Sequence, residues 1–124
     1  MPIEVHTMNT GVTDSAALMI FMTGAKRYAC ATSAFLFHQP TWTFASKDDQ
    51  PLTVVSDAVR WLTTYQNMMA EIIAAGSEDK LTKDKVLSML AVGTTVTAKE
   101  ALEIGLGREI AEAAVPREAI WWQV

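Results

Sequence analysis

The chain opens with a stretch in which apolar and polar positions alternate. This stretch, IEVHTM over residues 3–8, leads into the turn-forming segment Asn9–Gly11, which predicts a strand followed by a turn. An uninterrupted apolar run then extends over Ala16–Met22 and stops before Gly24. A run of this length with a glycine stop predicts a buried helix that begins near Ser15.

A second apolar run ends in a different way. Residues Ala34–Phe37 are followed by His38, Gln39 and Pro40, which predicts a buried strand that ends in a turn. Strand, helix and strand in this order form a βαβ unit, and such units build a parallel sheet with right-handed crossovers. The predicted fold class is therefore α/β.

The longest periodic segment extends from Leu52 to Ala75. Its apolar residues recur at helical spacing and it stops before Gly76, which predicts a long amphipathic helix. Trp61 and Met68 lie off the main apolar stripe and indicate either a wider core face or an exposed contact surface. The preceding segment, Thr41–Pro51, has no periodicity and is expected to be a lid or a packed connector.

The last third of the chain contains shorter elements. Thr97 and Glu100 have the spacing of a capping box, and Gly105 supplies a stop, which predicts a short helix between them. The other expected segments are a charged connector over Ser77–Lys85, a short helix over Val86–Leu90, a strand over Glu109–Ala111 and an apolar tail at Ile120-Trp121-Trp122.

Composition limits the classes of function. The chain has 124 residues, of which 50% are hydrophobic and 19% charged, as expected for one globular domain. Its net charge is −4 and it has no dense run of Lys or Arg. Because phosphate binding needs clustered positive charge, nucleic acid is not expected as the main partner.

The cysteine and histidine content limits the chemistry further. Cys30 is the only cysteine, so no internal disulfide can form, and a reducing cytoplasm is the expected location. The first residues, MPIEVHTMN, have no basic n-region and no apolar h-region, so no signal peptide is expected, and the longest apolar run is too short to span a membrane. His6 and His38 are the only histidines and no HExxH motif is present, so neither a metal nor a cofactor is expected.

Ser15 and His38 are the candidate catalytic residues. A serine hydroxyl becomes a good nucleophile when a base accepts its proton, and histidine is the usual base. The free N–H groups of a first helical turn would also favour negative charge beside Ser15, which suits acyl transfer. The competing interpretation is structural, because serine is a good N-cap and a histidine beside a turn is often only hydrogen-bonded.

Several segments resemble one known family, in the same order. Gly11 and Ser15-Ala16-Ala17 precede an apolar helix, and Thr97–Leu106 (TAKEALEIGL) matches the closing helix and its Gly-Leu turn. The segments GAKRYA at Gly24–Ala29 and FLFHQP at Phe35–Pro40 lie between them. Together these motifs resemble the proteolytic subunit of the Clp protease, over almost the whole chain.

The resemblance implies one domain over residues 1–124 with the fold of the Clp-protease-like and crotonase-like superfamily. In that family the matching serine is the nucleophile and the histidine of the His-Gln-Pro turn is the base. This implies that Ser15 and His38 serve a serine peptidase that acts on peptide or protein substrates. It also implies a homo-oligomer, with subunits that meet face to face through the helix over residues 52–75, and an ATPase or complementary subunit as a further partner.

The chain departs from the family at the catalytic acid. Losing the acid of a known triad lowers the rate about ten-thousandfold, because the acid holds the imidazole and stabilises its charged form. Gly93 stands where the family has its catalytic aspartate, and Arg108 stands where its closing motif has another aspartate. The candidate substitutes near His38 in sequence are Asp48, Asp49 and Asp57.

The second departure is at the beginning. In the family a half-domain precedes the serine, and a glycine-rich strand in it supplies oxyanion-hole N–H groups. The sequence starts after that region, which suggests a truncated or reduced domain whose first strand is open to pairing with another copy or a partner. Two alternatives therefore stay open: a non-catalytic oligomeric assembly subunit, and a crotonase-like acyl-thioester enzyme that needs no serine.

Overall fold

The computed structural model describes residues 2–114, which form two three-stranded sheets and four helices. The first sheet has the order β1-β3-β6 and is parallel throughout. The second has the order β2-β4-β5, in which β2 and β4 are parallel and β5 is antiparallel to β4. The strands are β1 (His6–Asn9), β2 (Val12–Asp14), β3 (Lys26–Ala29), β4 (Ala34–Leu36), β5 (Thr95–Thr97) and β6 (Glu109–Ile110).

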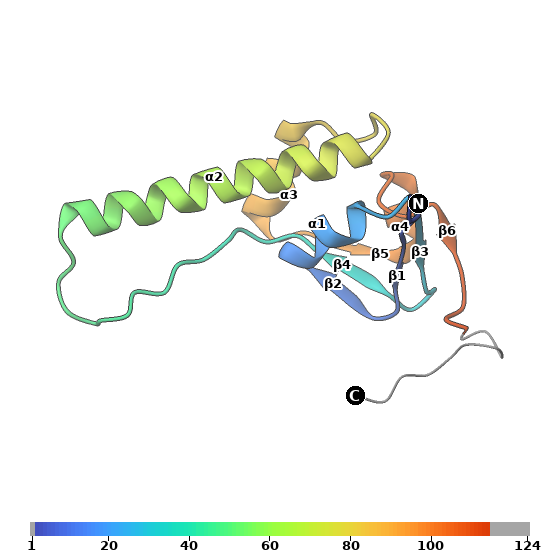
Figure 1. Cartoon of the computed structure of the whole chain (residues 1–124), viewed down its shortest axis with the longest axis horizontal. Helices are drawn as coiled ribbons and strands as arrows, with labels where there is room; N and C mark the ends of the chain where they lie inside the picture. The colour runs from blue at the N-terminus through green and yellow to red at the C-terminus, as the bar shows by residue number, and fades with distance from the viewer. Residues whose placement is uncertain (1, 115–124) are drawn as a thin grey trace.

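The parallel sheet predicted from the sequence is thus only part of the arrangement. The antiparallel β5 was not expected, because its three residues, Thr95–Thr97, are too short a stretch for a strand pattern to be recognised. The α/β class itself agrees with the alternation of strands and helices along the chain (Figure 1).

The two sheets are built from the same two segments of chain, each of which bends once. The segment β1–β2 bends at Thr10 and Gly11, and the segment β3–β4 turns over residues 30–33. Asn9 is 3% exposed at the first bend, where its Nδ2 donates to the carbonyl of Ala34 at 2.8 Å and its Oδ1 accepts from the N–H of Gly11 at 3.1 Å. This buried amide therefore ties the bend of one segment to the start of β4.

The helices largely follow the predicted boundaries. The helix expected over residues 16–22 is confirmed, the long helix ends one residue later than expected, and the helix near residue 86 begins earlier, inside the expected connector. The helices are α1 (Ala16–Met22), α2 (Leu52–Gly76), α3 (Lys83–Val92) and α4 (Ala98–Glu103).

The capping box of α4 is also confirmed. The N–H of Thr97 donates to Oε2 of Glu100 at 2.8 Å, and the N–H of Glu100 donates to Oγ1 of Thr97 at 3.3 Å. Beyond the helix Gly105 adopts a φ of +80°, and a Cβ at this position would lie 2.2 Å from the carbonyl oxygen of Ser77. Only glycine suits both conditions, which explains the stop seen in the sequence.

The core lies between the sheets and the helices. The rings of Phe21 in α1 and Phe35 in β4 meet edge to face, with their centroids 5.0 Å apart. Burying each large apolar side chain stabilises the fold by about 1.5–3 kcal/mol, so this cluster fixes α1 and α2 over the strands. The other fully buried large side chains include Leu18, Phe37, Met69, Ile73, Val86, Leu90 and Leu106.

The apolar stripe of α2 is buried mainly in its second half. Met69, Ala70 and Ile73 are buried, whereas Val59 is 57% and Trp61 47% exposed. Figure 1 shows the first half of α2 extending away from the sheets, with the loop before it running out beneath the helix. The interpretation of Trp61 and Met68 as part of a wider core face therefore does not hold, since Met68 is 43% exposed.

The connector before α2 makes one aromatic contact with it. The ring centroids of Trp42 and Trp61 lie 5.5 Å apart in an edge-on contact. Trp61 stacks on Tyr65, with ring centroids 5.0 Å apart and an interplanar angle of 7°.

Among the described residues, no helix is long and apolar enough to cross a membrane. The apolar tail expected at residues 120–122 lies outside the described residues.

Candidate active site

Ser15 occupies the sharp turn between a strand and a helix. β2 ends at Asp14 and α1 begins at Ala16, so a single residue reverses the direction of the chain. Ser15 adopts φ 47° and ψ −119°, a conformation that costs a side-chain-bearing residue of order 1–3 kcal/mol. Its N–H donates to the carbonyl of Leu36 at 3.2 Å and its carbonyl accepts from the N–H of Leu18 at 3.0 Å. These bonds hold the strained residue in place from both sides.

The Ser15 hydroxyl is not used to cap the helix. Ser15 lies at the N-cap position, as the sequence predicted, yet its side chain makes no capping hydrogen bond. The residue is half-buried, and its backbone rather than its hydroxyl carries the structural contacts. The purely structural interpretation of this serine therefore lacks the hydrogen bond on which it depends.

His38 follows the end of β4 by two residues and is half-buried. Its Nδ1 lies 2.9 Å from the carbonyl oxygen of Gln39. A carbonyl oxygen can only accept, so this hydrogen bond requires the proton to be on Nδ1. In the neutral ring, Nε2 then carries the free lone pair, as a general base requires.

The strand pairing brings these two positions to the same edge. β2 and β4 are parallel and Asp14 pairs with Leu36, so the chain leaves both strands at their carboxyl ends, where Ser15 and His38 follow. The hydrogen bond that His38 makes goes to Gln39, and in the described part of the chain none joins its ring to Ser15. Catalytic hydrogen bonds are often long or poorly aligned before substrate binds.

Gly93 comes opposite His38 when the pairing of β4 with β5 is extended by two residues. It ends α3 with a φ of +70°, and its N–H donates to the carbonyl of Met89. The N–H of Phe37 donates to the carbonyl of Thr94 at 2.8 Å, which continues the antiparallel pairing of β4 with β5. The residues that follow in this register are His38 and Gly93, and glycine has no carboxylate to offer the imidazole.

The substitute acids suggested by the sequence are not joined to His38. Asp48 accepts a hydrogen bond from the Ser46 hydroxyl at 2.7 Å within an exposed local turn. Asp49 and Asp57 are also exposed. The hydrogen-bond partner of the imidazole is instead the Gln39 backbone, which side-chain patterns in a sequence cannot reveal.

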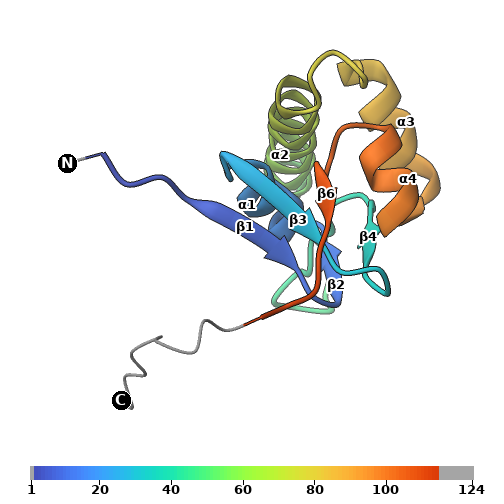
Figure 2. The same cartoon turned by 90° about the vertical axis from the view of Figure 1, so that its right-hand side faces the viewer.

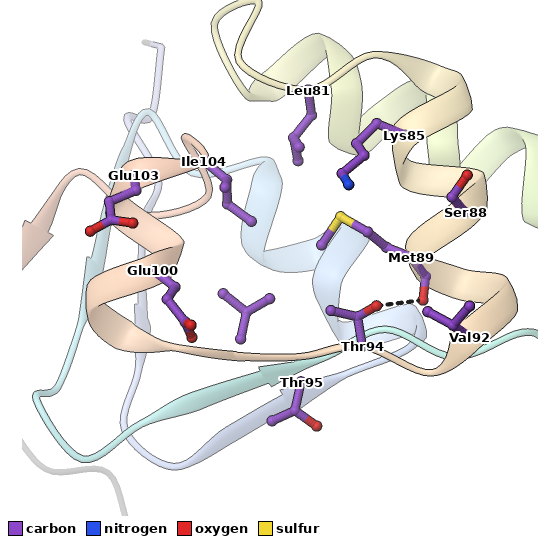
Figure 3. A pocket seen from close by; sticks show the side chains of 11 residues that line it. Leu81, Lys85, Ser88, Met89, Val92, Thr94, Thr95, Glu100, Glu103 and Ile104 are labelled. Atoms are coloured by element: carbon purple, nitrogen blue, oxygen red, sulfur yellow. Dashed lines mark hydrogen bonds between the residues drawn. The ribbon is translucent and has the colours of Figure 1, made fainter.

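A hollow of about 380 Å³ lies on another part of the surface, between α3, β5 and α4. Figure 3 shows its apolar wall of Leu81, Met89 and Ile104, with Lys85 and Glu103 on opposite sides. Neither Ser15 nor His38 lines it. Over residues 2–114, no group of three or more His, Cys, Asp or Glu side chains is placed to hold a metal ion.

Comparison with protein families decides the relationship. The family model described as Clp protease matches residues 1–114. The chain belongs to the Clp protease family. Members of this family are oligomeric serine proteases that act on protein substrates. A search of curated proteins returns no match. The resemblance seen in the Ser15, His38 and Thr97–Leu106 motifs is thus confirmed at the level of the family.

Proposed function

We propose that this Clp protease family member is a serine peptidase in which Ser15 is the nucleophile and His38 the general base. The observation that carries the proposal is the conformation of Ser15. A serine held in a strained strand-to-helix turn, with its hydroxyl left out of the helix cap, has the geometry of a nucleophile elbow. The adjoining strand β4 leads to a histidine whose bond to Gln39 leaves Nε2 as the basic nitrogen.

The reaction would proceed through an acyl-enzyme. The Ser15 hydroxyl attacks the carbonyl carbon of a peptide bond while Nε2 of His38 accepts its proton. The resulting oxyanion receives a hydrogen bond from the N–H of Ala16, the residue that follows the nucleophile. His38 then gives the proton to the departing amine, and water releases the acyl group by the same steps.

The carbonyl of Gln39 takes over part of the role of a triad acid. It keeps the proton on Nδ1 and fixes the plane of the ring. A neutral carbonyl stabilises the imidazolium ion less than a carboxylate does, since only the carboxylate carries a full negative charge. We therefore propose an active but slow peptidase, because loss of the acid in a complete triad lowers the rate about ten-thousandfold.

An activated ester tests this proposal without knowledge of the substrate. The parent chain should release a burst of p-nitrophenolate from p-nitrophenyl acetate, approaching one equivalent per chain, as the acyl-enzyme accumulates. Ser15→Ala should abolish the burst, and His38→Ala should slow it at least a hundredfold. Ser33→Ala is the matched control, because Ser33 is buried and its hydroxyl donates a hydrogen bond to the backbone carbonyl of Cys30. A burst that persists in Ser15→Ala would refute the assignment of the nucleophile.

A non-catalytic assembly subunit is the second candidate. Two observations favour it: Gly93 offers no carboxylate beside His38, and the first half of α2 exposes Val59 and Trp61. This reading predicts a stable oligomer that shows no burst, and the oligomer is unaffected by Ser15→Ala. In both readings we propose that the chain forms a homo-oligomer through this part of α2.

A further inference from the structure

The hollow of about 380 Å³ between α3, β5 and α4 lies along the outer edge of a sheet. β5 is the last strand in the order β2-β4-β5, and no strand within residues 2–114 lies on its other side. Figure 2 shows α3 and α4 on the side of the molecule away from β1. The hollow is large enough for a small ligand, because such sites measure about 300–1,000 Å³.

Thr95 presents its backbone at this outer edge. The N–H of Phe37 donates to the carbonyl of Thr94 at 2.8 Å, and the N–H of Ala98 donates to the carbonyl of Ser33 at 3.1 Å. Alternate residues of an antiparallel strand bond to the same neighbour, so the even-numbered residues of this segment face β4. Thr95 therefore turns both its N–H and its C=O outward, as a residue does that can pair with an added strand.

The lining of the hollow above β5 is apolar. Figure 3 shows Met89 of α3 and Ile104 of α4 extending toward each other over β5, whereas Thr95 points to the opposite side of the strand. Val96, the next residue of β5, also lines the hollow and is 5% exposed. Because successive side chains of a strand lie on opposite faces, every second side chain of a strand placed along β5 would enter the hollow.

The two ends of the hollow carry opposite charges. Glu100 and Glu103 belong to α4, which follows the carboxyl end of β5, and Lys85 belongs to α3, which precedes its amino end. Hydrogen bonds from the backbone and then the side chain of Thr97 lower the pKa of Glu100, so its carboxylate is negative at neutral pH. Within residues 2–114, neither Lys85 nor Glu103 is in an ion pair.

We propose that this hollow binds a short apolar peptide with free ends, which adds to β5 as an antiparallel strand. Its ammonium group lies at Glu100 and Glu103, and its carboxylate lies at Lys85. Its middle residue exchanges two hydrogen bonds with the backbone of Thr95, and the side chains on either side of that residue enter the hollow.

Other small ligands fit fewer of these groups. A fatty acid would pair with Lys85 and fill the apolar lining, but it would bring no partner for Thr95 or for the two carboxylates. An apolar amine would pair with the carboxylates and leave Lys85 alone. Only a peptide supplies both charges, apolar side chains and an amide backbone at strand spacing.

Isothermal titration calorimetry with tripeptides tests the predicted register. Leu-Thr-Leu points both leucines into the hollow and should show saturable binding. Thr-Leu-Thr points only threonines into it and should bind at least tenfold more weakly. Because neither Ser15 nor His38 lines the hollow, Ser15→Ala should bind Leu-Thr-Leu as the parent does, and a failure of binding says nothing about catalysis.

Blocked peptides test the two charged ends. Amidation of the carboxyl end and Lys85→Gln should each weaken binding about two- to fivefold, and together no more than either alone, because they remove the same ion pair. Acetylation of the amino end should weaken binding by a similar factor, and Glu103→Gln should reduce the effect of acetylation. Lys47→Gln is the matched control, because Lys47 is exposed in the connector before α2. Equal weakening of free and amidated peptide by Lys85→Gln would refute the carboxylate contact.

N-methylation tests the hydrogen bonds to Thr95. A methyl group on the middle nitrogen of Leu-Thr-Leu should weaken binding at least tenfold, whereas one on the third nitrogen should change it less than twofold. Equal loss at both nitrogens, or no saturable binding of Leu-Thr-Leu, would overturn the proposal. A concentration-dependent dimer that the peptide dissociates, seen by sedimentation, would also overturn it and assign the hollow to a second copy of the chain.

Discussion

The N–H of Phe37 donates to the carbonyl of Thr94 at 2.8 Å, one residue beyond the last paired residues of β4 and β5. This bond continues the antiparallel register, so that His38 and Gly93 come next on the two strands. Gly93 ends α3 in a left-handed conformation, and an added Cβ would meet no atom within 4 Å. A side chain added at Gly93 would therefore meet open space.

Gly93→Asp should raise the reactivity of Ser15. A carboxylate at this position can accept the hydrogen bond of the His38 Nδ1–H in place of the Gln39 carbonyl and stabilise the imidazolium ion. We predict an increase of at least tenfold in the rate of Ser15 acylation by a fluorophosphonate, measured by intact mass over time. The φ of +70° makes the substitution cost about 1–2 kcal/mol in stability, which aspartate tolerates better than most residues.

Two variants separate charge from shape at this position. Gly93→Asn has nearly the same shape and no charge, so it should give a smaller increase in acylation rate than Gly93→Asp. Gly93→Ala reports the cost of the backbone strain alone. Equal rates for the parent, Gly93→Asp and Gly93→Asn would contradict the view that a missing carboxylate limits this site.

Arg27 is predicted to be essential for stability. Its side chain is 4% exposed, and it donates to the carbonyls of Leu106 and Gly76 at 2.6 Å each and to that of Gly105 at 3.1 Å. Burial, and then repulsion by Arg108, lowers the pKa of its guanidinium, which still stays protonated at neutral pH. Arg27→Met leaves these carbonyls without a donor and should cost at least about 3 kcal/mol.

Urea denaturation followed by tryptophan fluorescence measures this loss. Arg27→Lys should retain part of the stability, because one ammonium group reaches fewer of the carbonyls. Arg60 is exposed on α2, so Arg60→Met should change the free energy of unfolding by less than about 0.5 kcal/mol. If Arg27→Met were as stable as Arg60→Met, the buried guanidinium would not hold β3 to the ends of α2 and α4.

The exposed half of α2 should control the oligomeric state. Val59 and Trp61 are large apolar residues on a part of the helix that the core does not cover. A charged residue there should oppose burial against another subunit, so Val59→Glu should reduce the mass measured by light scattering after gel filtration. Thr63→Glu, also exposed on α2, is the control for an added charge. An unchanged mass in Val59→Glu with folding intact would move the interface elsewhere.

The capping box of α4 should make the free energy of unfolding depend on pH. Hydrogen bonds from the backbone and then the side chain of Thr97 lower the pKa of Glu100 below its ordinary 4.5. A lowered folded-state pKa stabilises the fold fully above the unfolded value and loses this contribution as the pH falls through the folded value. The difference in free energy of unfolding between the parent and Glu100→Gln should therefore be larger at pH 7 than at pH 3. A difference that is constant with pH would contradict this.

Elements with their own start and stop signals could be predicted from the sequence. α1 and α4 each combine an apolar or capping pattern with a glycine stop, and both occur where expected. β3 was missed because Lys26 and Arg27 do not look like a buried strand. The buried guanidinium of Arg27 is surrounded by carbonyls from two distant segments, the end of α2 and the turn after α4, which is tertiary information.

The candidate site divides in the same way. The order of motifs pointed to Ser15, to His38 and to the missing carboxylate at Gly93, since these depend on residue identity and spacing. The strained φ of Ser15 and the bond between His38 and Gln39 could not be predicted. The first is a backbone conformation at the end of β2, and the second joins a side chain to the carbonyl of the next residue, so neither leaves a mark on the side-chain pattern.

Labelling with a fluorophosphonate tests the central claim, that His38 activates Ser15, most directly. Intact-mass and peptide-mapping analysis should find a single adduct on Ser15 of the parent chain. The adduct should be absent from Ser15→Ala and strongly reduced in His38→Ala, with both variants folded by circular dichroism. A parent chain that stays unlabelled in every oligomeric form, or an adduct that His38→Ala leaves unchanged, would contradict the account.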